Sequence, residues 1–356
     1  MSDVKSIKTN IQTSMNLIKN SPKYPNNLDD IKTLTVGDEI AKDIMEFEET
    51  VKDYYTKITD IEQLEGGMQG ELITLFDEYI KNPEVHQILF KYFGDNYTDE
   101  DVELLFYRIN MAGCGYVAVT NILMDYAIEN YTEEEFEEIF GFSMYRDKQK
   151  TLGNHEGCER IPKNLNTGLM TLDFFLYYAT NFDGNDTIEK IYGNSAQEVK
   201  SGDMDSSDRT GTAGTYSHEV GIIFQDYLRE KGINVDIINM YSDIGDGQFD
   251  EKTLVPVHVD NVDVDYYKEI ASENDAKLVI DAYDFTLYLP FDKDNNGKLD
   301  DVIKENCGGH AMTVVGVTND GKFLVDSWGQ QYVLDPEEVN ADGVKVIHNY
   351  CVYKFE

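Results

Sequence analysis

Apolar residues recur at three- and four-residue steps in the first third of the chain, a pattern that predicts amphipathic helices. One such stripe consists of Ile40, Ile44, Phe47, Val51 and Tyr54. A second, after a helix break at Gly66-Gly67, consists of Leu72, Leu75, Phe76, Tyr79 and Ile80. A third helix is expected to begin at Thr98 or Asp99 and to lead up to Asn110. The first part of the chain is therefore predicted to be helical.

The stretch 111–124 (MAGCGYVAVTNILM) carries no charged residue, which predicts a helix buried on nearly every face. Thr132 and Glu135 form a capping-box signature for a short acidic helix that ends near Gly141. Two more helices are predicted at 171–180 and 217–231. The stretch 194–215 is rich in Gly, Ser, Asp and Thr without periodicity, which predicts a long surface loop.

Beyond residue 232 the pattern changes to β-branched and aromatic runs, which predict strands. These runs lie at 235–241, 277–283, 285–289, 311–317, 322–326 and 346–355. The sequence Asn319-Asp320-Gly321 predicts a tight turn between two of them. Helices followed by strands indicate an α+β fold and not alternating βαβ units.

The chain has 68 acidic and 30 basic side chains and a formal net charge of -38, with 41% hydrophobic residues. The apolar content predicts a folded protein. A negative field of this size repels phosphate backbones and anionic lipid, so nucleic acid and membranes are not expected as partners. It favours cationic partners and Ca²⁺, but a solvated acidic surface without any partner is a better explanation than any specific ligand.

Four cysteines, Cys114, Cys158, Cys307 and Cys351, do not make a disulfide framework, so a reducing compartment is expected. The first residues lack the apolar segment of a secretory signal, and no run reaches the ~18 apolar residues of a membrane span. We therefore expect a cytoplasmic protein, or one exported without a cleavable signal, with no transmembrane segment.

Cys114 lies between two glycines where irregular chain meets the predicted buried helix. The positive end of a helix stabilises a thiolate, and flanking glycines let a substrate carbonyl approach backbone N–H groups. Cys114 is therefore a candidate nucleophile, and the alternative is an inert buried cysteine.

His310 begins one predicted strand and Asp326 ends the next, so the turn between them places the two residues at the same edge. An acid that accepts a hydrogen bond from a histidine fixes its tautomer, as a base that activates a nucleophile requires. Trp328, the only tryptophan, follows closely and is expected to shield that hydrogen bond from water. A capped hairpin with a surface histidine is the alternative.

GCGYVAVTNIL, followed far downstream by GGHAMTVVGVTNDGKFLVDSWG, resembles the papain-like cysteine peptidases, most closely the bacterial branch that includes bacteriocin-leader peptidases. The resemblance implies a helical half and a twisted antiparallel β half with a Cys114, His310 and Asp326 triad between them. It covers roughly 105–356 as the catalytic domain, with insertions near 142–166, 194–215 and 290–308. Residues 1–104 would form a helical N-terminal region that acts as an inhibitory or delivery segment.

That family usually carries a glutamine about six residues before the cysteine, which helps to hold the oxyanion. Arg108 stands there in this chain, and Asn110 follows it, so both are candidates for the oxyanion-hole side chain. The resemblance implies a peptidase that cleaves peptide or protein substrates through a thioester and needs no cofactor. The alternatives are a deamidase or transglutaminase of the same fold, and a catalytically inactive binding module or effector.

Residues 292–300 match the first nine places of an EF-hand calcium loop, with the required glycine at the sixth place. The candidate ligand positions are Asp292, Asp294, Asn296, Lys298 and Asp300. Ile303 occupies the twelfth place, where a bidentate Glu is expected. The sequence therefore predicts a weak Ca²⁺ site, and an Asx-rich turn without metal is the alternative.

Overall fold

The computed structural model describes residues 67, 69–146, 165–201, 210–212, 214–242, 268–269, 276–288, 302–318 and 320–356. Helices in this part of the chain are α4 (Glu71–Thr74), α5 (Phe76–Tyr79), α6 (Pro83–Phe93), α7 (Asp99–Ala112), α8 (Cys114–Asn130), α9 (Glu133–Phe140), α10 (Thr167–Asn181), α11 (Ile188–Ser201) and α12 (Ser217–Glu230). Strands are β1 (Val235–Ser242), β2 (Ala276–Ala282), β3 (Phe285–Tyr288), β4 (Val302–Cys307), β5 (His310–Val317), β6 (Phe323–Ser327), β7 (Gln330–Leu334) and β8 (Ile347–Phe355).

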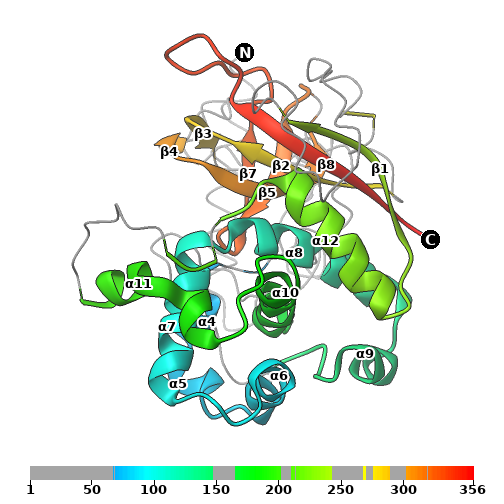
Figure 1. Ribbon diagram of the computed structural model, residues 1–356. Helices are drawn as coiled ribbons and strands as arrows, with labels where there is room; N and C mark the ends of the chain where they lie inside the picture. The colour runs from blue at the N-terminus through cyan, green and yellow to red at the C-terminus, as the bar shows by residue number, and fades with distance from the viewer. Residues whose placement is uncertain are drawn as a thin grey trace, which may run out of the picture.

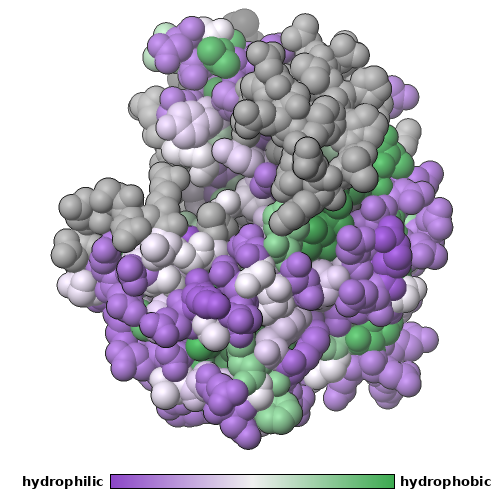
Figure 2. Space-filling view, viewed as in Figure 1, coloured by the Kyte–Doolittle hydropathy of each residue, from purple (hydrophilic) through white to green (hydrophobic). Residues whose placement is uncertain are grey.

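The described strands form one sheet in the order β1-β8-β2-β5-β6-β7-β3-β4, and each pair is antiparallel. The helices gather on one side of this sheet, with α8 and α12 against it (Figure 1). The α+β prediction is therefore confirmed at the level of helices and an antiparallel sheet. On the face drawn in Figure 2, the described surface of the helical half is largely hydrophilic.

Several helices begin and end at the residues that local sequence signals predicted. Thr98 and Thr132 each accept a hydrogen bond from the third helical N–H, in the capping boxes of α7 and α9. Gly141 ends α9 in the left-handed conformation, which glycine adopts without steric cost. The apolar stretches became α8 and α10, whose residues are mostly buried.

Three predictions of local structure were wrong. The stripe from Leu72 to Ile80 forms two short helices that break at Leu75. Helix α11 continues to Ser201, so the first part of the expected 194–215 loop is helical. Strands β4 and β7 were missed, because their sequences, VIKENC and QQYVL, are too polar to stand out as apolar runs.

Two apolar clusters lie on opposite faces of the sheet, because successive side chains along a strand point to opposite faces. Val279, Ala311 and Cys351 belong to the cluster shared with the helices. Ile280 and Met312, one position along, belong to the cluster on the opposite face. Alternate residues of each strand therefore face α8, and the site described below lies at one end of this face of the sheet.

The position 104/105, predicted to separate an N-terminal region from the catalytic domain, falls inside α7. Leu72, Leu89 and Leu105 lie in the same buried cluster as Tyr116 of α8. The described part of the N-terminal region therefore shares a core with the remainder.

Within the part of the chain that the structure describes, no single helix is both long and apolar enough for a membrane span. The α7 and α8 pair, bent by 88°, passes the same test of length and composition.

Candidate active site

Helices α7 and α8 meet at a sharp corner on Gly113, and Cys114, the first residue after this corner, is partly exposed. A Cβ at position 113 would collide with the carbonyl of Ile109 in the last turn of α7, so the end of this helix requires glycine. Cys114 is the first residue of α8, where backbone N–H groups have no partner within the helix. The corner therefore presents the thiol together with the positive end of the helix.

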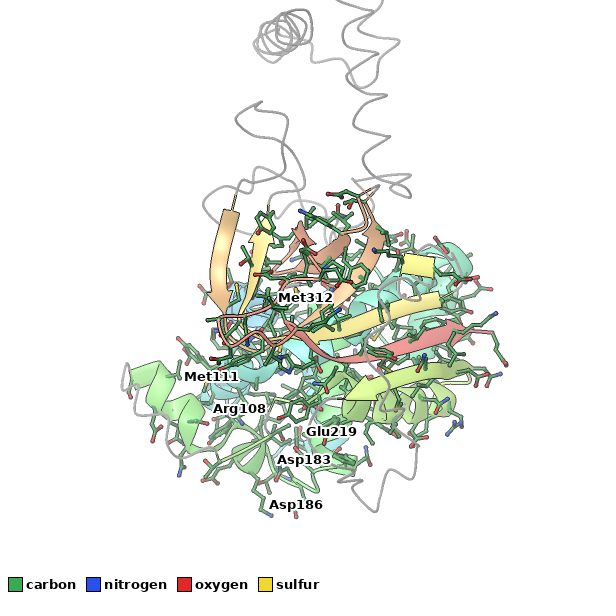
Figure 3. The ribbon with its side chains drawn as sticks, turned by 90° about the horizontal axis from the view of Figure 1, so that it is seen from above. Arg108, Met111, Asp183, Asp186, Glu219 and Met312 are labelled. Carbon is green, nitrogen blue, oxygen red and sulfur yellow. The ribbon has the colours of Figure 1, made fainter. Side chains whose placement is uncertain are left out.

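Cys114 is partly exposed and lies in a cavity of about 700 Å³ between the helices and the strand ends. The walls come from α7, the start of α8, residues 214–216 and the ends of β2, β5 and β8. In Figure 3, Arg108 and Met111 of α7 lie close together on the helical side, whereas Met312 lies within the sheet. The cavity is therefore a cleft between a helical wall and a β wall.

The pKa of the Cys114 thiol is raised from its ordinary value, chiefly because the group is removed from water. The backbone N–H of Ala311 donates toward the sulfur and opposes this, and the N–H groups of Gly115 and Cys114 act in the same sense. The Asp281 carboxylate raises the thiol pKa further. A base is therefore needed to take the proton when the sulfur reacts.

His310 is the first residue of β5, directly before Ala311, and it lines the same cavity as Cys114. Its Nε2 shares a 2.6 Å hydrogen bond with Oγ of Ser327. Its ring stacks on Trp328, with centroids 4.3 Å apart and planes 10° apart, and Phe285 lies parallel to it at 6.4 Å. The imidazole plane thus lies nearly parallel to both aromatic rings, and the shielding of a His310–Asp326 hydrogen bond by Trp328 stays a prediction.

Asp326 is buried on β6, opposite Thr313 of β5 and Gln331 of β7. A second, small cavity of about 10 Å³ brings Asp326, His310 and Cys114 together. The structure therefore gathers all three residues of the expected triad. The His310–Asp326 hydrogen bond itself stays a prediction, and Ser327 is the partner found on Nε2.

We expect Asp326→Asn to keep most activity, because an amide oxygen can replace a carboxylate oxygen as hydrogen-bond acceptor. Ser327→Ala should lower kcat on the order of tenfold, since a net hydrogen bond is worth about 1 kcal/mol. Ser327→Thr keeps the hydroxyl and is the control. Steady-state kinetics of the three variants decide which residue orients His310; full activity in Ser327→Ala would remove Ser327 from this role.

Trp328 and Gly329 form the two-residue turn between β6 and β7, with φ values of 47° and 78°. Positive φ at both positions is the signature of a type I′ turn, which favours Asn-Gly. A bulky side chain there is strained and persists only where its surroundings hold it. In this strained backbone conformation the indole stacks on the His310 ring, and such strain at a site favours a functional role for Trp328.

Two substitutions of Trp328 distinguish the effect of backbone strain on stability from the effect of the indole on His310. Trp328→Asn fits the left-handed conformation and Trp328→Ala does not, so the Asn variant should be more stable by about 1 kcal/mol. Both lose the stacked indole, and both should lose activity by a similar factor, on the order of tenfold. Thermal melting and kcat test this; equal stability of the two variants, or wild-type activity in either, would contradict it.

The two sequence-based candidates for the oxyanion hole have other contacts. Arg108 is buried in the wall of the larger cavity, where Nε donates to Thr212 O at 2.5 Å and Nη1 to Ser195 Oγ at 2.7 Å. Asn110 lines neither of the two cavities described here. Its backbone carbonyl instead accepts a hydrogen bond from Nε2 of Gln69.

Gln69 lines the small cavity with Cys114 and His310. It is brought there by Gly67, whose buried N–H donates to Oδ1 of Asn121 on α8 at 2.6 Å. A Cβ on Gly67 would lie 2.8 Å from Thr167, so only glycine fits this approach. A glutamine amide has two N–H groups, so one can bind Asn110 while the other is offered to a ligand.

Sequence reasoning missed three residues of this site, namely Gln69, Asp281 and Ser327. A glutamine does line the small cavity with Cys114, but it comes from the segment ahead of α4 and not from the residues just before the cysteine. Ser327 stands next to Asp326, and Asp281 interrupts an apolar strand; that interruption was a visible signal.

The predicted calcium ligands at 292–300 lie outside the described residues, so the calcium site stays a prediction. Among the residues that the structure describes, no three His, Cys, Asp or Glu side chains are grouped as a metal site would need.

Comparison with known proteins gave no match to this chain among protein-family models, curated proteins or solved structures.

Proposed function

We propose that the chain is a papain-like cysteine peptidase that hydrolyses peptide bonds through a thioester on Cys114. One observation carries the proposal: the Cys114 thiol lies at the start of a buried helix, against the N–H of Ala311, in a cavity shared with His310. A nucleophile, a base oriented by a third group and an open cleft are the parts that acyl transfer from an amide requires.

In the proposed reaction, the sulfur of Cys114 forms a bond to the substrate carbonyl carbon while His310 takes the thiol proton. His310 lines the cavity beside Cys114, and its Nε2 shares a hydrogen bond with the Ser327 hydroxyl. When the C–N bond breaks, His310 returns the proton to the leaving amine. Water, deprotonated by His310, then hydrolyses the thioester and releases the acid and the free thiol.

The negative charge on the tetrahedral oxygen needs donors that are already in place. The backbone N–H of Cys114 is one, because the first amides of a helix have no intrahelical acceptor. The side-chain amide of Gln69 is the other in this proposal, in the place that sequence reasoning gave to Asn110 or Arg108.

Alkylation of the cysteines by iodoacetamide tests the proposal within one molecule. Cys351 is fully buried, with its pKa raised to about 12 by burial, so it serves as an internal control. Cys114 should react much faster than Cys351, and His310→Ala should slow Cys114 alone. A peptide library then distinguishes hydrolysis, which releases new amino termini, from deamidation, which releases ammonia. Equal reaction of both cysteines, or a rate unchanged by His310→Ala, would refute the proposal.

A further inference from the structure

Asp281 is a carboxylate in an otherwise apolar part of the sheet. In strand β2, Val279 faces the helical cluster, and the alternation of side chains places Asp281 on the same face. Its neighbours across the sheet are Ala311 of β5 and Asn349 of β8. An acidic residue at a buried strand position costs free energy, so its presence calls for a reason.

Part of that reason is structural. Oδ2 of Asp281 accepts a 2.7 Å hydrogen bond from the N–H of Ser217, the first residue of α12, and Asn349 also donates to the carboxylate. These bonds do not compensate for burial, which raises the pKa of Asp281 to about 6. A carboxylate has acceptor sites for about four hydrogen bonds, so the Ser217 N–H, the Ser217 hydroxyl and Asn349 leave capacity for one more donor from a ligand.

The carboxylate also lies close to the reacting sulfur. Asp281 and Cys114 line the same 700 Å³ cavity, and the negative charge of Asp281 acts on the thiol. Ala311, whose N–H donates toward the sulfur, is the register partner of Asp281. A substrate residue adjacent to the bond that Cys114 attacks therefore has its side chain within reach of Asp281.

The charge of Asp281 and the negative field of the whole chain favour a cationic ligand, against one opposing positive charge on Arg108 in the described lining. Among the described residues that line the cavity, Asp281 is the one acidic residue. Arg108, on the helical wall, already donates to Thr212 and Ser195. The net charge of -38 attracts cationic peptides to the protein as a whole.

We propose that Asp281 binds a lysine or arginine side chain of the substrate next to the scissile bond, and so makes the peptidase selective for basic peptides. This inference rests on the proposed function. A hydrogen bond to a charged partner is worth more than a neutral one, and an ammonium or guanidinium group would neutralise the buried carboxylate.

The test uses pairs of short peptidyl chloromethyl ketones, which alkylate an active-site cysteine and need no turnover. One member of each pair carries arginine and the other citrulline, a neutral analogue of nearly the same shape, at the first or second residue from the ketone. Alkylation of Cys114 in the full-length protein should be about 10- to 100-fold faster with arginine at one of these positions. Iodoacetamide measures the intrinsic reactivity of Cys114 in parallel.

Asp281→Asn should reduce the arginine preference to within about threefold, because the amide keeps an acceptor for Ser217 but loses the charge. Asp284→Asn is the matched control. It removes the same charge just beyond β2, outside the residues that line the cavity, at a left-handed position (φ 52°) that asparagine tolerates. This variant should keep the full preference.

The outcomes separate this inference from the proposed function. If iodoacetamide fails to label Cys114 faster than Cys351, the proposed function fails and the inference with it. If iodoacetamide labels Cys114 but arginine and citrulline reagents react equally or not at all, only the inference is overturned. A preference for arginine that survives in Asp281→Asn also overturns it, because the charge would then come from elsewhere.

Discussion

Replacing Cys114 with alanine is expected to lower peptide hydrolysis by on the order of 10³-fold or more, because the reaction loses its nucleophile. The fold should persist, since Cys114 is only partly buried and the corner that holds it depends on Gly113. The measurement is kcat/KM on a cleaved library peptide, together with a thermal melting curve. Activity within tenfold of wild type would remove Cys114 from the reaction.

Cys351→Ala is the matched control for this experiment. Cys351 is fully buried on β8 and packs in the cluster between sheet and helices. Its replacement removes one buried sulfur and should lower stability by about 1 kcal/mol while leaving kcat unchanged. Cys114→Ala should thus lower activity and spare stability, whereas Cys351→Ala should lower stability and spare activity.

Gln69→Ala is expected to lower kcat by about 10²- to 10³-fold with little change in KM, the effect of losing one oxyanion donor. The donor acts on charge that exists only in the transition state, so substrate binding is spared. Gln69→Glu keeps the shape and should lose as much, because a carboxylate repels the oxyanion. Single-turnover rates of thioester formation measure the step directly.

Asn110→Ala is the control, because Gln69 binds the backbone carbonyl of Asn110, which this substitution keeps. It should leave kcat within about threefold of wild type, a smaller change than the loss of one net hydrogen bond would cause. The reverse result, a large loss in Asn110→Ala and none in Gln69→Ala, would return the oxyanion role to Asn110, one of the two candidates from sequence reasoning.

The sequence alone determined the elements whose signals are local. The capping boxes at Thr98 and Thr132 start α7 and α9, and an uncharged stretch became the buried helix α8. The β5–β6 hairpin is likewise local, and Gly321 adopts the positive φ of its turn. Because the motifs around Cys114 and His310 lie at the ends of such elements, a candidate nucleophile and a candidate base could be chosen from sequence.

Only the tertiary structure decided which side chains surround them. Gln69 lines the same small cavity as Cys114 because Gly67 packs closely on Thr167 and Asn121, and no spacing in the sequence encodes that arrangement. Asp281 faces the cleft because the register of β2 with β5 and β8 puts it there. Strand pairing and helix packing join residues far apart in the chain, and their geometry depends on the whole core at once.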